Sequence, residues 1–212
     1  MALSLRRGRV TAVVERHEGL VRLEVDGRPC VAYPRLTGPV ALDDEVVVNV
    51  QAAELGLGSG GFDVLHANLT RGLGLPAEPG AHVVKLPYTP LQHAVLHAEE
   101  GGALPDRLVR TPVVCCSLHS QLAPVCAGLG LEPAVAYVQL AGGALPVSLS
   151  DTVRALRAER RLRTAVAVGP SFDGDVACVS LPAALLWCVR EGMDAIVCGI
   201  GPGVAGTGTR YG

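Results

Sequence analysis

The chain has 212 residues, of which 49% are apolar and 18% charged, and its formal net charge is −2. This composition excludes a disordered chain, and the lack of a positive excess makes nucleic acid an unexpected main partner. Seven cysteines, most of them inside apolar runs and none in a Cys-x-x-Cys pair, predict free thiols in a reducing compartment. Because the sequence has no signal peptide and no apolar run of about 18 residues, we expect a cytoplasmic protein without a membrane segment.

The N-terminal part of the chain has the pattern of short β-strands. Four apolar, β-branched runs lie at 10–14, 21–25, 29–33 and 45–50. Asp26-Gly27, between the second and third runs, is typical of a type I′ hairpin turn. Four or five strands of this kind usually close into a barrel, so we expect a small β-barrel domain over residues 1–70.

The C-terminal part alternates strands and helices. Its near-continuous apolar runs predict parallel strands covered by helices on both faces, at 112–116, 133–140, 164–168 and 194–198. Ser150 and Ser180 are expected to cap the helices that follow them, and Pro124 allows the first helix to begin no earlier than about Ser120.

The expected fold is therefore mixed α/β. The small N-terminal β-barrel is followed by a connecting β-rich segment over residues 71–110. Residues 111–212 are expected to form a Rossmann-like three-layer domain with a mainly parallel sheet.

The most distinctive run follows the last predicted strand, with glycine at 201, 203, 206 and 208. Because glycine has no Cβ, its backbone can approach an anion such as phosphate closely. The spacing Gly201-x-Gly203-x-x-Gly206 matches the dinucleotide-binding fingerprint, but no helix follows the glycines, which weakens that interpretation. The loop is predicted to be one wall of an anion site.

Polar or glycine-rich residues follow every predicted parallel strand. In an open parallel sheet, ligands bind beyond the carboxyl ends of the strands, although short loops of this composition occur in any α/β domain. We predict that the strand ends converge on one edge and bind a phosphate-bearing small molecule or nucleotide. The expected ligand-binding residues are Ser120, Gly142, Gly143, Gly201, Gly203, Gly206, Thr207 and Gly208.

Three residues at these strand ends are candidate catalytic groups. His119 is the candidate proton carrier because histidine titrates near neutrality, but a hydrogen bond to a loop backbone group explains it equally well. Ser117 is a candidate nucleophile if a base lies within reach, although helix capping is the favoured role. Asp173 can share a metal with Asp175 if the loop folds inward, although a solvated loop is favoured.

No metal site is predicted, and the sequence names no cofactor. His93 and His97 have the spacing of helical metal ligands, but the glutamate of the His-Glu-x-x-His motif is absent and the surrounding residues suit a strand. Whether the chain catalyses a reaction stays open.

Six segments, in the same order along the chain, resemble the bacterial family catalogued as Domain of Unknown Function 3866: 36–40, 53–61, 85–92, 118–122, 142–146 and 201–209. The resemblance covers nearly all of the chain but implies no reaction, so no residue inherits a catalytic role. Members of that family run on past the glycine loop, which implies that this chain is C-terminally short.

Two further hypotheses accompany the phosphate-ligand site. The first is a non-catalytic regulatory module whose barrel binds RNA or protein. Arg6, Arg7 and Arg9 form a short basic segment at the start of the chain, which is a weak signal of RNA binding. The second is a structural protein in which the glycines only allow tight packing. A homo-oligomer is compatible with all three hypotheses.

Overall fold

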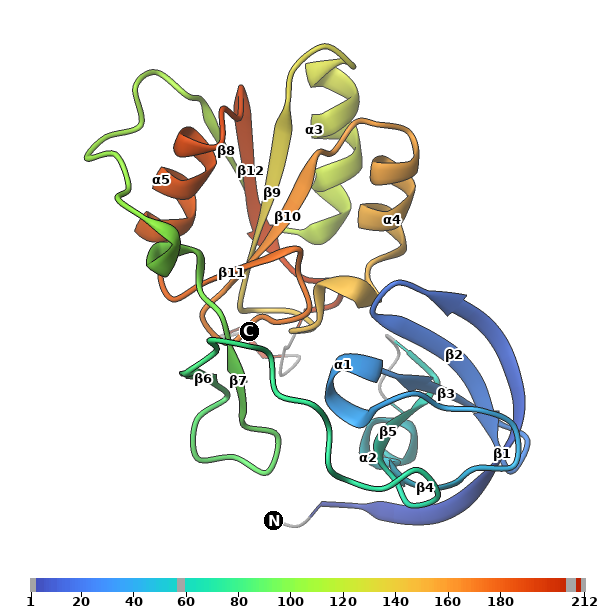
Figure 1. Ribbon diagram of the computed structural model, residues 1–212. Coiled ribbons are helices and arrows are strands. Elements are labelled where there is room, and N and C mark those ends of the chain that lie inside the picture. Colours follow the sequence, from blue (N-terminus) through green and yellow to red (C-terminus); the bar gives the residue numbers. More distant parts are fainter. Residues whose placement is uncertain (1–2, 57–59, 205–208, 211–212) are drawn as a thin grey trace. The chain divides into compact units, whose positions relative to one another are not determined.

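The computed structural model describes residues 3–56, 60–204 and 209–210. The chain forms two compact units, Met1–Pro76 and Ala77–Gly212, which fold around separate hydrophobic cores (Figure 1). The fold is mixed α/β with few helical residues. A closed β-barrel forms the first unit, and an all-parallel sheet is the centre of the second.

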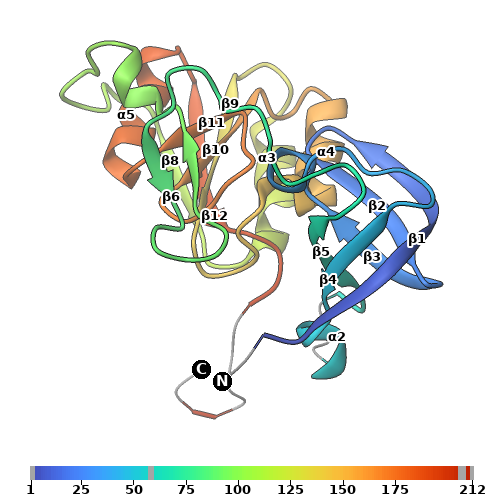
Figure 2. The ribbon, with the colours of Figure 1, turned by 60° about the horizontal axis from the view of Figure 1, so that its bottom comes forward.

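In the first unit, the strands close into a barrel in the order β1-β2-β3-β5-β4 (Figure 2). The strands and two one-turn helices are β1 (Leu5–His17), β2 (Leu20–Val25), β3 (Arg28–Ala32), α1 (Pro34–Thr37), β4 (Glu45–Asn49), α2 (Gln51–Glu54) and β5 (Asp63–Asn68). Alternate residues of the strands point inward and form the core, as a half-buried barrel strand requires. The predicted small barrel is confirmed.

Strand β1 closes the barrel because it pairs with two neighbours. Its first half pairs with β4 and its second half with β2, with register shifts where the strand bends. Gly8 fits at this place because a Cβ would lie 2.5 Å from Oδ2 of Asp26. Asp26 and Gly27 both have positive φ, 51° and 73°, so the predicted type I′ turn is confirmed.

A buried carboxylate holds the turn that leads into β4. Asp44 is 3% exposed, and its Oδ2 accepts hydrogen bonds from the Ala41 N–H at 2.8 Å and from Asn68 Nδ2 at 2.9 Å. Arg71 Nε donates to the same oxygen at 2.6 Å. Burial by itself would raise the pKa of Asp44, but these three donors outweigh it and hold the pKa below its ordinary value. The ionised carboxylate therefore stabilises the turn.

The second unit contains a parallel sheet in the order β11-β10-β9-β12-β8 and a separate hairpin of β6 and β7. Its strands are β6 (Val83–Lys85), β7 (His93–Val95), β8 (Val113–Cys116), β9 (Val135–Leu140), β10 (Thr164–Val168), β11 (Val176–Cys178) and β12 (Ala195–Ile200). Its helices are α3 (Leu122–Leu129), α4 (Asp151–Ala158) and α5 (Leu181–Arg190), with 3-10 turns η1 (Ala98–Gly101), η2 (His119–Gln121) and η3 (Val147–Leu149).

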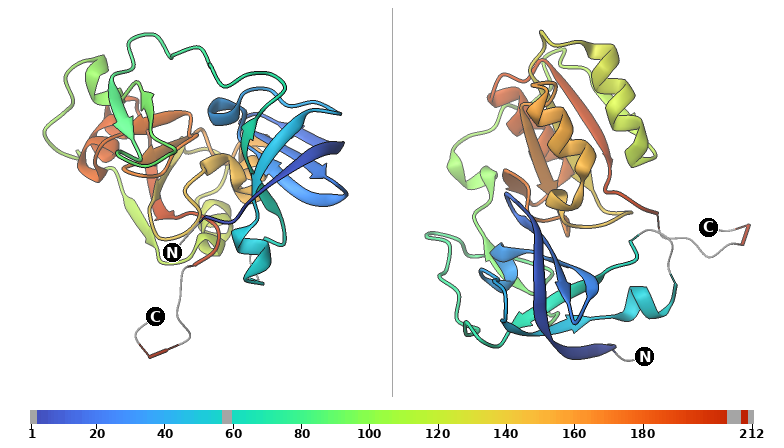
Figure 3. Two further views of the ribbon diagram at one scale, coloured as in Figure 1. Left: turned by 90° about the horizontal axis from the view of Figure 1, so that it is seen from below. Right: turned by 90° about the vertical axis from the view of Figure 1, so that its right-hand side faces the viewer.

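Helices cover both faces of the parallel sheet (Figures 1 and 3). Helices α3 and α4 lie on one face, where Leu122 and Leu156 share a core cluster with Tyr137 of β9. Helix α5 lies on the other face, where Trp187 shares a cluster with Ile196 of β12. The strands are buried on both sides, which explains their near-continuous apolar sequences.

Both predicted helix caps are confirmed. Ser150 Oγ accepts a hydrogen bond from the Val153 N–H at 3.0 Å, and Ser180 Oγ accepts one from the Ala183 N–H at 3.3 Å. Helix α3 begins after Ser120, so that Pro124 lies in its first turn, as expected. None of the helices in the described ranges is long and apolar enough to span a bilayer.

Lys85, the only lysine of the chain, anchors the β6–β7 hairpin to the carboxyl end of β10. Its ammonium group is buried and donates hydrogen bonds to the carbonyl oxygens of Gly169 at 2.8 Å and Ser171 at 2.7 Å. A third carbonyl oxygen, that of Ala167, lies 3.4 Å away. Burial lowers the pKa of Lys85 to about 8.

This lowered pKa can be measured directly. In protein labelled only at lysine Cε, one lysine NMR signal is expected, and its shift should titrate with a midpoint near 8. Unfolded protein in urea is the control and should titrate near the ordinary value of 10.5. A midpoint near 10.5 in the folded protein would contradict burial as the dominant influence on the pKa of this ammonium group.

Candidate functional site

The carboxyl ends of three neighbouring strands meet at one edge of the parallel sheet. Gly199 of β12 is in register with Cys116 of β8 on one side and with Gln139 of β9 on the other. Because all three strands run in the same direction, the segments that follow them begin side by side (Figure 1). The predicted convergence of these strand ends is confirmed.

His119 connects the segments at this edge. It lies in the 3-10 turn that follows β8, and its Nδ1 is 3.0 Å from the carbonyl oxygen of Ile200, at the end of β12. Its Nε2 is 2.6 Å from Oγ of Ser150, at the start of α4. A carbonyl oxygen only accepts hydrogen bonds, so the network assigns the proton to Nδ1 and leaves the lone pair on Nε2.

Ser150 has two hydrogen-bonding roles at once. Its Oγ accepts from the Val153 N–H as the N-cap of α4, and its hydroxyl proton is free to point at Nε2 of His119. The serine is 2% exposed, so its hydroxyl has exchanged water for these two partners. The result is an oriented chain of hydrogen bonds from Ser150 through His119 to the Ile200 carbonyl.

Tyr137 supports the same arrangement from β9. Its hydroxyl donates to the Ile200 carbonyl oxygen at 2.7 Å, and its ring packs edge-on against the imidazole of His119. Burial raises the pKa of Tyr137 well above its ordinary value, so the phenol stays a neutral donor. Two donors on one carbonyl oxygen fix the position of the imidazole ring.

Burial also lowers the pKa of His119 below 6.5, and the hydrogen bond to Ile200 only partly opposes this effect. The unfolded chain therefore binds more protons than the folded chain as the pH falls below 6.5. The contribution of the neutral His119 to the free energy of unfolding is therefore expected to be fully present above pH 6.5. It should be lost as the pH falls through the lowered folded-state pKa.

Urea unfolding at several pH values tests this dependence. Stability of the wild type should fall more steeply below pH 6.5 than that of His119→Gln, which has no imidazole at this position. The matched control is His82→Gln, because His82 is 71% exposed. If His119→Gln and the wild type lose stability in parallel, the imidazole is not buried in its neutral form.

The glycines at this edge allow two loops to pack backbone against backbone. A Cβ on Gly143 would lie 2.1 Å from the Gly201 carbonyl oxygen, and a Cβ on Gly201 would lie 2.0 Å from the Ala144 carbonyl oxygen. Gly142 has a φ of 130° and faces Ile200. These contacts account for the glycines through packing, which agrees with the structural hypothesis for them.

Of the remaining residues of the predicted glycine wall, Gly203 lies in the described part of the chain. Gly203 is exposed and has a φ of 79°. Gly206, Thr207 and Gly208 lie outside the described residues. Their role as an anion cradle stays a prediction.

The other candidate catalytic residues lie apart from the hydrogen bonds of His119. Ser117 is exposed and its Oγ donates to Oε1 of Gln121 at 3.3 Å, so its partner in the described chain is an amide rather than a base. Ser120 is exposed in the same 3-10 turn. Asp173 lies in the loop after β10 with a φ of 61°, and its carboxylate oxygens are buried.

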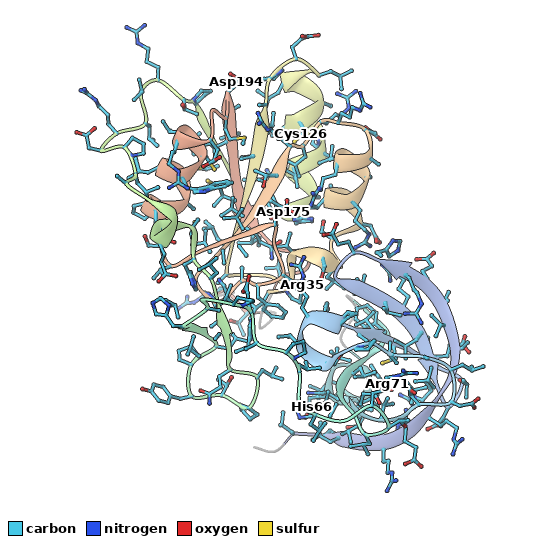
Figure 4. The ribbon with its side chains drawn as sticks, viewed as in Figure 1. Arg35, His66, Arg71, Cys126, Asp175 and Asp194 are labelled. Carbon is cyan, nitrogen blue, oxygen red and sulfur yellow. The ribbon has the colours of Figure 1, made fainter. Side chains whose placement is uncertain are left out.

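Asp175 has a structural role. Its carboxylate accepts from the Ala165 N–H at 2.8 Å and pairs with Arg157, which ties the start of β11 to β10 and α4 (Figure 4). Asp194 lies at the opposite, amino end of the sheet, where it accepts from the Ala134 N–H at 2.7 Å (Figure 4). Neither carboxylate is placed to assist His119.

The two histidines that have the spacing of metal ligands do not belong to a metal-binding cluster in the described part of the chain. No group of three or more histidine, cysteine, aspartate or glutamate side chains able to hold a metal occurs there. His93 lies in β7, as its surroundings suggested, while His97 is the N-cap of the 3-10 turn η1. Each imidazole Nδ1 contacts a nearby backbone carbonyl, of Leu91 and Val95 respectively.

Sequence reasoning missed three members of this edge. Tyr137 and Gln139 sit inside an apolar strand, and Ser150 was predicted only as a helix cap. Gln139 Nε2 donates to the carbonyl oxygens of Ala144 and Leu145, while its Oε1 is buried and accepts no hydrogen bond from the described residues. The available signal was two polar residues, two positions apart, on one face of a buried strand.

A family model described as a protein of unknown function, DUF3866, matches residues 29–212. The chain belongs to this family. In this DUF3866 chain, the matched segment begins within β3 of the barrel and includes the whole edge from His119 to Ile200. A search of curated proteins finds no match.

Proposed function

We propose that residues 77–212 bind a phosphate-bearing small molecule, such as a nucleotide, at the carboxyl edge of the parallel sheet. The observation that carries the proposal is the position of His119, which is hydrogen-bonded at once to the end of β12 and the start of α4. A Rossmann-like arrangement places ligands at the same edge of a sheet.

Three features of the edge suit such a ligand. Helix α4 begins at this edge with Ser150 as its N-cap, and helix N-termini favour anions. Gln139 offers a fixed, buried acceptor, which matches a hydroxyl or amino group on the organic part of a ligand. The neutral His119 can accept a proton from a bound molecule, which would make the site catalytic.

The barrel supports the alternative function less well. Of the basic residues at the start of the chain, Arg6 pairs with Asp26 and Asp63, and Arg7 pairs with Glu45. These carboxylates compete with RNA phosphates for the same guanidinium groups. Binding of RNA or protein by the barrel therefore ranks second.

The cysteines favour a cytoplasmic location. All seven fall within the described ranges and are free thiols, and burial raises the pKa of several of them, among them Cys30, Cys178, Cys188 and Cys198, to about 12. Such buried thiols are unreactive and suit a reducing compartment.

A thermal-shift screen against nucleotides, dinucleotides and sugar phosphates tests the proposal. At least one compound should raise the midpoint of wild type and of His82→Gln, and the same compound should raise that of His119→Gln by clearly less. No shift with any phosphate-bearing compound, or an equal shift in His119→Gln, would contradict the proposed site.

A further inference from the structure

The hydrogen bonds of Ser150 exceed what a helix cap requires. Ser180 caps α5 through the same contact to a first-turn N–H, and it does so at an exposed position. Ser150 is buried and has in addition a 2.6 Å hydrogen bond to Nε2 of His119. Capping of α4 does not require the hydrogen bond between Ser150 and the imidazole, so this hydrogen bond indicates a second role for Ser150.

The geometry around Ser150 matches the parts of an activated nucleophile. A nucleophilic serine requires a base within hydrogen-bond reach and a third group that orients the base. Nε2 of His119 is the base, and the Ile200 carbonyl oxygen, 3.0 Å from Nδ1, orients it. Tyr137 holds the same carbonyl oxygen from the other side.

We propose that Ser150 is a nucleophile for acyl transfer from an ester or thioester, with His119 as its general base. This inference does not rest on the proposed phosphate ligand. Ser150 Oγ forms a bond to the acyl carbon, its proton passes to Nε2 of His119, and the bond from the acyl carbon to the alcohol or thiol breaks. The proton on Nε2 then leaves with the departing alkoxide or thiolate, and water hydrolyses the acyl-serine by the same route.

Two properties of the site agree with this step. Burial lowers the pKa of His119, so the base is neutral and able to accept a proton near pH 7. The first turn of α4, which begins after Ser150, favours the negative charge that develops on the acyl oxygen during attack. Because Ser150 is 2% exposed, only a small electrophile can reach it, which restricts the acyl group to a short chain.

Methanesulfonyl fluoride is a small probe for this nucleophile. Attack by Oγ forms an S–O bond, breaks the S–F bond, releases fluoride and passes the serine proton to His119. Mass spectrometry of the full chain should show one adduct, and peptide mapping should place it on Ser150. The reaction should be absent in Ser150→Ala and about 100-fold slower in His119→Gln, the lower range for loss of a general base.

Ser180→Ala is the matched control, because it removes an equivalent helix cap without touching His119. Its labelling rate should equal that of the wild type, and thermal denaturation should show that each variant is folded. No adduct on the wild type, an adduct on another residue only, or an unchanged rate in His119→Gln would overturn the proposal. These results are independent of the phosphate-ligand screen, so failure of one proposal leaves the other standing.

Discussion

Replacing Gly201 by alanine is expected to destabilise the second unit by about 3 kcal/mol, the upper range for overpacking a rigid site. The new Cβ would lie 2.0 Å from the Ala144 carbonyl oxygen and 3.0 Å from Nε2 of Gln139. The closest atom belongs to the backbone and cannot rotate away, so the loop after β9 has to move. Urea unfolding followed by circular dichroism measures the effect.

Gly128→Ala is the matched control for this substitution. Gly128 is an exposed residue of α3, and no atom outside its own helix lies within 4 Å of the position of its Cβ. Alanine there should stabilise the protein by up to about 1 kcal/mol, the difference between the two helix propensities. If Gly201→Ala is as stable as the wild type, the two loops are not packed backbone against backbone.

Asp44→Asn is expected to destabilise the barrel by about 2–4 kcal/mol, because three donors, one of them the Arg71 guanidinium, lose the negative charge of their buried acceptor. The asparagine side chain keeps the shape, and its oxygen can take the position of the Oδ2 to which the Ala41 N–H, Asn68 and Arg71 all donate, but it carries no charge. Since the pKa of Asp44 is lowered in the folded state, its stabilisation is present above the unfolded-state value of 3.8 and is lost as the pH falls through the folded-state value. Unfolding at neutral and acid pH measures both effects.

The neighbouring residue supplies the control for the barrel. Asp43 is exposed with a φ of 68°, a conformation that asparagine tolerates, so Asp43→Asn should leave stability nearly unchanged. If Asp44→Asn lowers the free energy of unfolding by the same amount at acid pH as at neutral pH, the carboxylate charge is not what holds the turn.

Local signals predicted the parts of the fold that depend on local chemistry. The turn at Asp26-Gly27, the caps at Ser150 and Ser180 and the long apolar strands each follow from a few adjacent residues. Strand β11 was missed because it has only three residues and follows the loop of residues 169–175. Its pairing with β10 is set by tertiary contacts such as those of Asp175.

The candidate site was predicted only in part, because its contacts join residues far apart in the sequence. Strand-end reasoning placed His119 at the carboxyl edge, but its partners lie 18, 31 and 81 positions along the chain. The glycines were expected to approach a ligand, whereas Gly143 and Gly201 approach each other's loops. Lys85 gave no functional signal, since only the fold brings its ammonium group to the end of β10.

Chemical-shift mapping by NMR tests the location of the ligand site most directly. The compound with the largest thermal shift is added to isotope-labelled protein, and backbone amide signals are followed through the titration. The proposal predicts that the perturbed residues cluster in 117–121, 139–153 and 199–203, at the carboxyl edge of the parallel sheet. Perturbations confined to the barrel, residues 5–68, would contradict it and favour the barrel as the binding module.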